Sequence, residues 1–124
     1  IVKQGGAELF VCGGWVQKST GSMLGYYATG FLLDFRFDAG FFGAASISDK
    51  LEVMTPTVDK AFLKRETALR CEKSYLVVDN SKFGRQSMVK INGLRDYTAV
   101  VTDRDFTSKE REIIIRDKIR IIEI

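Results

Sequence analysis

The sequence contains no histidine. This absence excludes a Ser-His-Asp triad and histidine-based acid–base catalysis, and it removes the ligand that most zinc sites use. Long apolar runs are also missing, because no stretch of the chain approaches the roughly 20 residues that a membrane-spanning helix needs. We therefore expect no triad hydrolase and no membrane contact.

Cysteine is scarce, with only Cys12 and Cys71, which lie far apart and each in or beside an apolar stretch. Isolated cysteines of this kind are typical of buried, reduced packing residues, and disulfides are rare in the cytoplasm. The acidic residues do not cluster at the spacing of metal ligands. The sequence therefore predicts a cytoplasmic protein with no metal site and no cofactor.

The chain also has little excess of positive over negative charge. The chain has 19 lysines and arginines against 16 aspartates and glutamates, so its net charge is only +3. A nucleic-acid-binding domain usually has a basic face and a higher isoelectric point. The 124 residues, 45% hydrophobic and 28% charged, suit one globular domain with one modest core. Without a repeat or a linker, we expect residues 1–124 to form a single domain.

Predicted strands alternate with predicted helices. The apolar spacing predicts helices at Met23–Phe35 and Thr57–Glu72, a third from Thr107 or Ser108 to about Asp117, and a loop or small excursion at 46–54. This alternation indicates an α/β fold with a mostly parallel sheet flanked by helices. We predict strands at Glu8–Cys12, Ala39–Ala44, Ser74–Val78, Tyr97–Thr102 and Ile119–Ile124, and burial of Trp15, Phe31, Phe41, Phe42, Leu76, Val77 and Val100.

The stretch from Phe37 to Arg65 is the most informative. An apolar run ends there in Gly43-Ala44-Ala45, small residues that let a ligand approach the backbone. A helix start follows, with Thr55 as the expected N-cap and Pro56 as the expected first helical residue. Such a strand, turn and helix is a usual place for an anionic ligand in open α/β sheets, although close packing of an ordinary βα unit explains the small residues equally well.

A polar loop follows the next predicted strand. Asn80–Arg85 offers a lysine, an arginine and a glycine, which suit a phosphate or carboxylate or simply form a solvated turn. Asp79 and Asp103 are candidate acids or hydroxyl-binding groups, or else turn formers at strand ends. Because open α/β sheets bind ligands at the carboxyl ends of their strands, the candidate site gathers Gly43–Ser46, Asp79–Arg85 and Asp103.

Two further patterns carry similar chemistry. Lys60, Lys64 and Arg65 share one predicted helix, where they either line a pocket or form a solvated charged face. Ser19-Thr20-Gly21-Ser22 has the hydroxyls and backbone N–H groups to hold an anion, although turn chemistry accounts for it equally well. Neither pattern decides between its alternatives by itself.

Taken together, the motifs resemble those of the C-terminal effector domain of DeoR-type bacterial transcription regulators. The likeness runs in order over nearly the whole chain. The matching residues are Thr20–Gly25; Phe35, Asp38, Phe41 and Gly43-Ala44; Thr55-Pro56 with Lys64-Arg65; Val77, Asp79 and Ser81-Lys82-Phe83-Gly84-Arg85; and Thr102-Asp103.

The resemblance implies a fold like that of ribose-5-phosphate isomerase and the CoA transferases. It also implies a regulator whose N-terminal winged helix-turn-helix binds an operator, and an effector that is a phosphorylated sugar or a related metabolite. Compared with the family, this chain lacks that DNA-binding domain and the first strand–loop–helix of the sensor domain, so we expect an N-terminally truncated piece. Asp38-Ala39 and Gly43-Ala44-Ala45-Ser46 depart from the family's usual Asp-Lys and Gly-Ala-Ser-Gly.

Residues and resemblance together predict the effector-binding domain of a homo-oligomeric regulator, a repressor, with no enzymatic activity and no catalytic residue. Lys82 and Arg85 would hold charge on the ligand, Asp79 would take sugar hydroxyls, and Lys64 would approach from its helix. The predicted effector-binding residues are Gly43, Ala44, Ser46, Thr55, Lys64, Asp79, Lys82 and Arg85.

Two alternatives stay open. One is a sugar-phosphate isomerase on the same fold, which needs a positioned base. Such isomerases carry Asp-Gly-Ala-Asp where this chain has Phe42-Gly43-Ala44-Ala45, and a catalytic glutamate opposite Lys64. The other alternative is a structural or oligomerisation domain whose pocket is closed in the complete protein.

We predict that the chain keeps no stoichiometric zinc or calcium after treatment with a chelator, because it lacks histidine and its cysteines and acids are dispersed. Elemental analysis of the chelated and dialysed protein measures this. One metal ion per chain that survives chelation would contradict the prediction.

Overall fold

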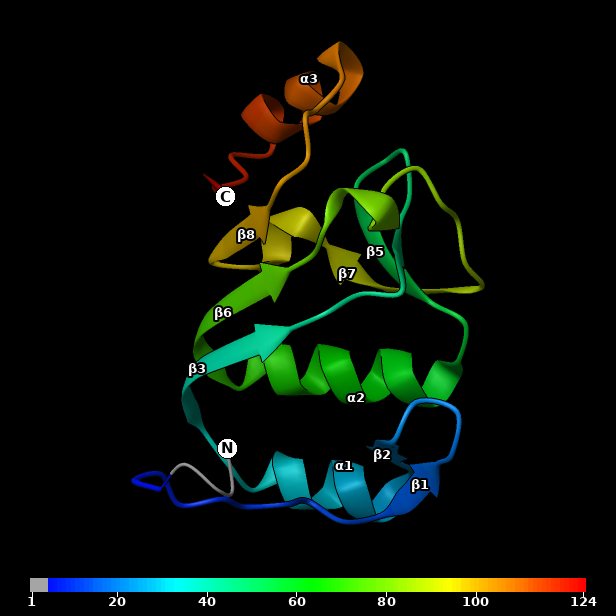
Figure 1. Cartoon of the computed structure of the whole chain (residues 1–124), viewed down its shortest axis with the longest axis vertical. Helices are drawn as coiled ribbons and strands as arrows, with labels where there is room; N and C mark the ends of the chain where they lie inside the picture. Colours follow the sequence, from blue (N-terminus) through cyan, green and yellow to red (C-terminus); the bar gives the residue numbers. More distant parts are fainter. Residues whose placement is uncertain (1–4) are drawn as a thin grey trace.

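A parallel sheet of four strands forms the centre of the computed structural model, which describes residues 5–124 (Figure 1). The strands are β3 (Phe37–Phe42), β6 (Cys71–Val77), β8 (Ala99–Thr102) and β9 (Ile121–Glu123), in that order across the sheet. All three pairings are parallel. The predicted α/β class with a mostly parallel sheet is therefore confirmed.

A second sheet is antiparallel and consists of β4 (Ser46–Ile47), β5 (Glu52–Thr55) and β7 (Val89–Gly93). Residues 46–54, predicted as a loop or small excursion, therefore contain β4 and most of β5, two short strands that the sequence did not predict. Strands of two and four residues are too short to show a clear alternation of apolar and polar side chains. In the turn that joins β4 and β5, Leu51 has a φ of 58°. This left-handed conformation is uncommon for a residue other than glycine, so the sequence did not predict the turn.

A small hairpin of β1 (Trp15–Gln17) and β2 (Ser22–Leu24) precedes the first helix, α1 (Tyr26–Leu33). The predicted helix began three residues too early, at Met23. Met23 instead pairs with Val16 in the hairpin, and Gly25 at a φ of 90° separates the hairpin from α1. The segment 8–12, predicted as a strand, forms none in this structure.

The remaining helices lie close to their predicted positions. Helix α2 spans Val58–Leu69, but its N-cap is Thr57, not the predicted Thr55. Helix α3 spans Ser108–Arg116, and Thr107 and Glu110 form a capping box at its start. Two short 3-10 turns, η1 (Asn80–Lys82) and η2 (Leu94–Asp96), complete the elements.

The core lies where one face of the parallel sheet meets the antiparallel sheet, α2 and α3. Phe42, Leu76 and Val100 are buried there, as predicted, and they come from three adjacent parallel strands. Other members of this buried cluster are Ile47, Val53, Ala61, Ile91, Leu94 and Phe106, with Ile113 and Ile114 of α3 packed against it. The core therefore holds together the elements that carry the loops at the sheet edge.

The opposite face of the parallel sheet is open, and this explains several wrong burial predictions. Side chains alternate along a strand, so Phe41 and Val77 point away from the core and are 74% and 45% exposed. Trp15, on the hairpin, is 65% exposed, and Phe31 is half-buried. The apolar runs identified strands correctly but did not show which face would be covered.

Ala61 is the buried residue of helix α2. Val58, Phe62 and Leu69, its larger apolar side chains, are exposed. A small side chain lets the helix axis approach the sheet closely. Neither cysteine is fully buried, contrary to expectation, although burial still raises the pKa of the Cys71 thiol.

None of the helices between residues 5 and 124 has the length and apolar character that a bilayer-spanning helix requires.

Replacing Phe42 with alanine should lower the free energy of unfolding by roughly 3–5 kcal/mol, because the side chain fills the core between β3, β6 and Tyr97. Phe41→Ala is the matched control, since its ring lies on the open face and its loss should cost less than about 1 kcal/mol. Urea denaturation of the two variants measures both values. Equal losses would show that the faces of β3 are assigned wrongly.

Candidate functional site

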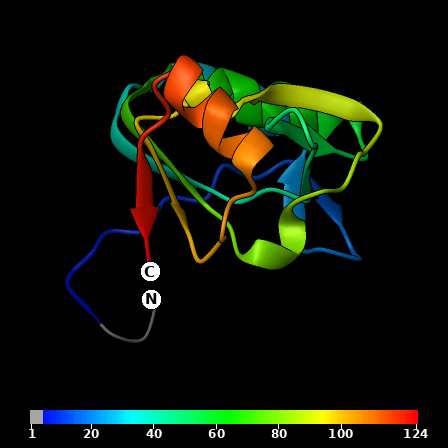
Figure 2. The same ribbon diagram turned by 90° about the horizontal axis from the view of Figure 1, so that it is seen from above.

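The carboxyl ends of the parallel strands share one edge of the molecule. Strands β3, β6 and β8 run in the same direction, so the segments that follow them emerge together. Figure 2 shows the tip of β9 and the η1 turn on this same side. Two contacts connect the segments: Ile47 forms a β-bridge with Phe83, and the Asn80 N–H donates to Asp103 Oδ1 at 2.7 Å. The fold therefore brings the three predicted segments together.

Lys64 approaches the end of β3 from the middle of α2. Its Nζ donates to the carbonyl oxygen of Gly43 at 2.6 Å, so two predicted site residues that are 21 positions apart are in direct contact. Burial, and secondly the charge of Lys60, lower the pKa of the Lys64 ammonium. Among residues 5–124 no carboxylate forms an ion pair with either lysine. The end of β3 therefore carries uncompensated positive charge.

Ser46, three residues beyond Gly43, lies in β4 and is buried. Its Oγ has no hydrogen-bond partner among the described residues, which is unusual for a buried hydroxyl. Ala44, between them, is half-buried and packs against the core. Of these two predicted residues, Ser46 has a buried hydroxyl without a partner in this part of the chain, whereas Ala44 contributes packing.

Thr55 does not fit its predicted role. It ends β5, is only 1% exposed, and neither caps α2 nor reaches the surface. The N-cap of α2 is Thr57, whose Oγ1 is buried and also has no partner within residues 5–124. The two-residue difference arises because β5 continues to Thr55, which moves the helix start beyond Pro56.

The loop after β6 is ordered by its own aspartate, Asp79. Asp79 Oδ1 accepts a hydrogen bond from the Ser81 N–H at 2.8 Å, and this bond lowers the pKa of the Asp79 carboxyl. Gly84 adopts a φ of 69°, and the Arg85 N–H donates to the Ile47 carbonyl at 3.1 Å. Lys82 is half-buried and Arg85 is exposed. The loop is thus fixed beside β4 with two cations on it.

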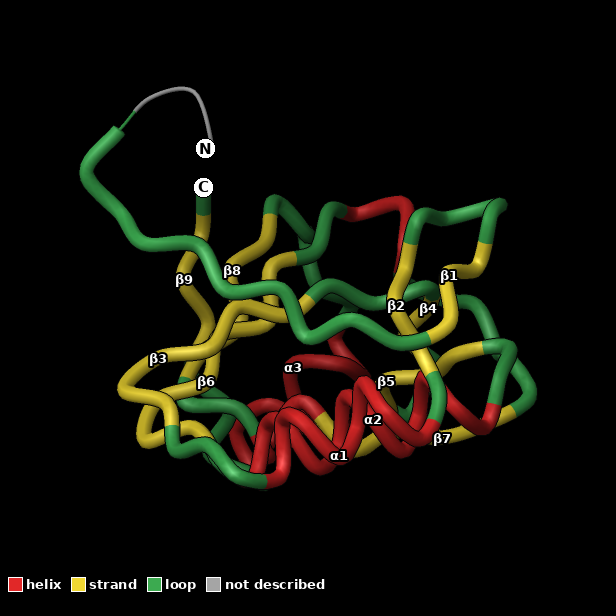
Figure 3. The backbone as a smooth tube through the Cα atoms, turned by 90° about the horizontal axis from the view of Figure 1, so that it is seen from below, coloured by secondary structure: helices red, strands yellow, loops and turns green. Residues whose placement is uncertain are grey.

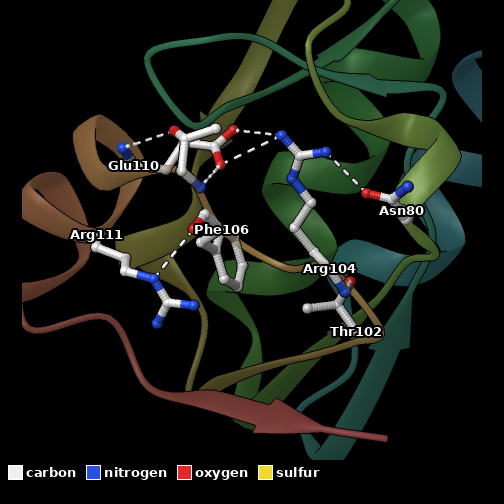
Figure 4. A network of polar contacts seen from close by, with 7 residues as sticks. Asn80, Thr102, Arg104, Phe106, Glu110 and Arg111 are labelled. Carbon is white, nitrogen blue, oxygen red and sulfur yellow. Dashed lines mark hydrogen bonds and ion pairs between the residues drawn. The ribbon is translucent and has the colours of Figure 1, made fainter.

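A polar network that the sequence did not reveal anchors this loop to α3 (Figure 4). Arg104 donates to Asn80 Oδ1 at 2.8 Å and forms a half-buried ion pair with Glu110 at 3.0 Å. Its guanidinium also lies 5.2 Å from the centre of the Phe83 ring, a cation–π distance. The capping-box spacing from Thr107 to Glu110 was the only sequence signal for this network.

A mainly apolar cavity lies away from this edge. It has a volume of about 670 Å³ between α1 and α2 and is lined by residues such as Tyr26, Tyr27, Val58 and Phe62. None of the predicted site residues lines it, and its lining includes no lysine or arginine. It therefore does not offer the chemistry of an anion site.

The sheet edge combines ammonium and guanidinium groups with hydroxyls and backbone N–H groups, which are the partners of a phosphate or carboxylate. Asp79 and Asp103 each accept a backbone N–H bond, which is the role of a turn former. No three cysteine, aspartate or glutamate side chains within residues 5–124 are grouped as a metal site would require. The predicted site residues that the structure connects are Gly43 with Lys64, and the 79–85 loop with β4.

Comparison with known families and proteins gives consistent matches. Residues 1–104 match the DeoR C-terminal sensor domain. The uncharacterized HTH-type transcriptional regulator FruR of Bacillus subtilis is 30% identical over 98 residues, which cover 79% of this chain and 39% of the relative. GlpR of Haloferax volcanii, also an HTH-type transcriptional regulator, is 30% identical over 107 residues, with coverages of 86% and 42%. The lactose phosphotransferase system repressor of Staphylococcus aureus is 27% identical over 116 residues, with coverages of 94% and 45%.

This chain thus spans about two-fifths of the length of these curated relatives, and their names describe transcriptional regulators rather than enzymes. The family match covers the hairpin, the parallel strands β3, β6 and β8, helix α2 and the η1 loop, which together build the candidate site. The chain belongs to the family of DeoR C-terminal sensor domains.

Proposed function

We propose that this chain is the effector-binding part of a DeoR-type transcription regulator that senses a phosphorylated sugar or a related metabolite. The full-length protein would act in the cytoplasm as a homo-oligomeric repressor and bind operator DNA through a winged helix-turn-helix that precedes this chain. The sensor-domain family and the regulator names of the relatives support this role. One relative's name, a lactose phosphotransferase system repressor, refers to a sugar.

The observation that carries the proposal is the Lys64 ammonium at the end of β3. It is partly withdrawn from solvent and bonded to the Gly43 carbonyl, and it has no carboxylate partner within residues 5–124. A partly buried cation without a counter-ion is unfavourable for the folded state. Its position at the carboxyl end of a parallel strand favours a site that an anionic ligand completes.

The loop after β6 supplies further charge to the proposed site. Neither Lys82 nor Arg85 forms an ion pair within the described residues, and a guanidinium fork fits phosphate oxygens well. Asp79 uses Oδ1 for the Ser81 N–H, while its Oδ2 makes no hydrogen bond in this part of the chain and can accept from a sugar hydroxyl. Together these groups match a ligand with one anionic end and several hydroxyls.

Binding would act through the equilibrium between arrangements of the regulator. A ligand shifts such an equilibrium by as much as its affinities for the two arrangements differ. The loop that carries Lys82 is tied to α3 through Arg104, so a ligand that repositions the loop also affects α3. Through the contacts of Arg104, ligand binding at the loop would change the position of α3.

We assign no catalytic role to the site. Proton transfer between adjacent carbons needs a positioned base within reach of the substrate. Asp79 and Asp103, the acids that follow β6 and β8, each hold a backbone N–H in a turn. At the end of β3, the Lys64 ammonium and the Gly43 backbone form a set of groups that suits the binding of an anion.

In the full-length protein, Lys82→Ala should raise the effector concentration that releases operator DNA by roughly ten- to a hundredfold. The expected cause is the loss of a charge-assisted hydrogen bond, typically worth about 1.5–3 kcal/mol. Fluorescence anisotropy of labelled operator DNA measures the release, with the effector first identified by a thermal-shift screen of sugar phosphates paired with their free sugars. Operator affinity without effector should stay nearly unchanged.

Lys109→Ala is the matched control, because Lys109 is an exposed lysine of α3 that makes no ion pair within residues 5–124. It should leave the effector response unchanged. If Lys82→Ala abolished operator binding and left effector affinity intact, Lys82 would belong to a folding or assembly contact, and the proposed site would be wrong.

A further inference from the structure

The turn between β1 and β2 lies against α2, although the two are far apart in sequence. Lys60 Nζ donates to Thr20 Oγ1 at 3.3 Å across 40 positions, and β2 packs against α2. Figure 3 shows this hairpin on the same side of the molecule as η1. The predicted Ser19–Ser22 pattern and the predicted lysines of α2 therefore meet in one place.

The hydroxyls of this turn leave a hydrogen-bond donor available. Thr20 Oγ1 lies 2.9 Å from Ser22 Oγ and 3.0 Å from Gln17 Oε1. A threonine hydroxyl has a single proton and can donate to only one of these oxygens at a time. Thr20 Oγ1 also accepts from Lys60 Nζ and from the Ser22 backbone N–H at 3.4 Å, which uses both of its lone pairs, so the Ser22 hydroxyl proton has no acceptor on Thr20. The turn thus offers an adaptable donor next to the Lys60 ammonium.

Lys60 and Lys64 are also placed against each other. They are four residues apart on α2, so their side chains share one face of the helix, where like charges repel. Lys60 is a cause of the lowered pKa of Lys64. The one lysine among residues 5–124 that forms an ion pair is Lys90, with Glu52 of the antiparallel sheet. This face of α2 thus keeps two close cations with no anion between them.

A buried hydroxyl lies one helical turn away. Thr57, the N-cap of α2, has a buried Oγ1 without a hydrogen-bond partner among the described residues, and Lys60 follows it by three positions. A buried hydroxyl without a partner is rare in folded proteins and calls for an explanation. It adds an unused polar group to the same end of α2.

From these contacts we propose a second anion subsite, in which Lys60, Lys64 and Ser22 bind a phosphate-type oxyanion of the effector. The proposal rests on the proposed function, because it assigns the subsite to the same ligand, on the hairpin side of Lys64. An oxyanion there would neutralise the two ammonium groups and accept from the Ser22 hydroxyl. Thr20 acts as a positioning residue, since its hydroxyl orients both Lys60 and Ser22.

The test uses the full-length protein, with inorganic phosphate as the probe and chloride at matched ionic strength as the reference, because surface charges are screened by salt. Isothermal titration calorimetry should show that Lys60→Met weakens phosphate binding about tenfold or more, and Ser22→Ala should weaken it less. Lys109→Met, which removes the same charge from an exposed site on α3, should bind phosphate like the wild type.

A second readout follows from the repulsion between the two lysines. Without phosphate, Lys60→Met should have a melting temperature equal to or above that of the wild type, and phosphate should raise the melting temperature of the wild type far more than that of the variant. A variant that melts lower than the wild type without phosphate, and gains as much from phosphate, would overturn the subsite.

The effector response separates failure of the subsite from failure of the proposed function. If Lys82→Ala weakens the response to the sugar phosphate and Lys60→Met does not, the subsite is wrong and the proposed function stands. If sugar phosphates release operator DNA from neither the wild type nor the variants, the proposed function fails. Loss of oligomerisation in Lys60→Met would show that the lysines meet another copy of the chain, and would also overturn the subsite.

Discussion

Parallel pairing of β3, β6 and β8 is the constraint on which the rest of this structure depends. It fixes the strand direction, and therefore places the segments after Phe42, Val77 and Thr102 at one edge of the sheet. The buried side chains on one face hold this sheet against the antiparallel sheet and α2. Lys64 and the 79–85 loop then reach the edge from different directions without needing long flexible connections.

The positive charge at this edge is left without counter-ions by the way the acids are used. Asp79 and Asp103 hold backbone N–H groups of the η1 turn, and Glu110 holds Arg104 and the start of α3. Each of these acids stabilises a loop and pairs with none of the site's lysines. Lys60 and Lys64 consequently repel each other in the folded protein, a cost that is commonly found where a site is kept ready for a ligand.

The sequence predicted the features that depend on local chemistry. Strand ends, the start of α3 at Thr107 or Ser108 and the helix at 58–69 follow from residue types at short spacing, and the strand-end rule located the loops that the structure brings together. Features set by tertiary packing were missed. Phe41 looks as buried as Phe42 in the sequence, and only the absence of cover on one sheet face distinguishes them. Thr55 failed as a cap because an unpredicted strand, β5, extends through it.

The most direct measurement is hydrogen–deuterium exchange of the full-length protein with and without a sugar phosphate that releases operator DNA. Binding at the sheet edge predicts slower exchange of the backbone amides of residues 43–46 and 79–85, with the α1–α2 cavity unchanged. Slower exchange confined to the residues around Tyr26 and Phe62, with no change after β3 and β6, would contradict the account and place the ligand in the apolar cavity instead.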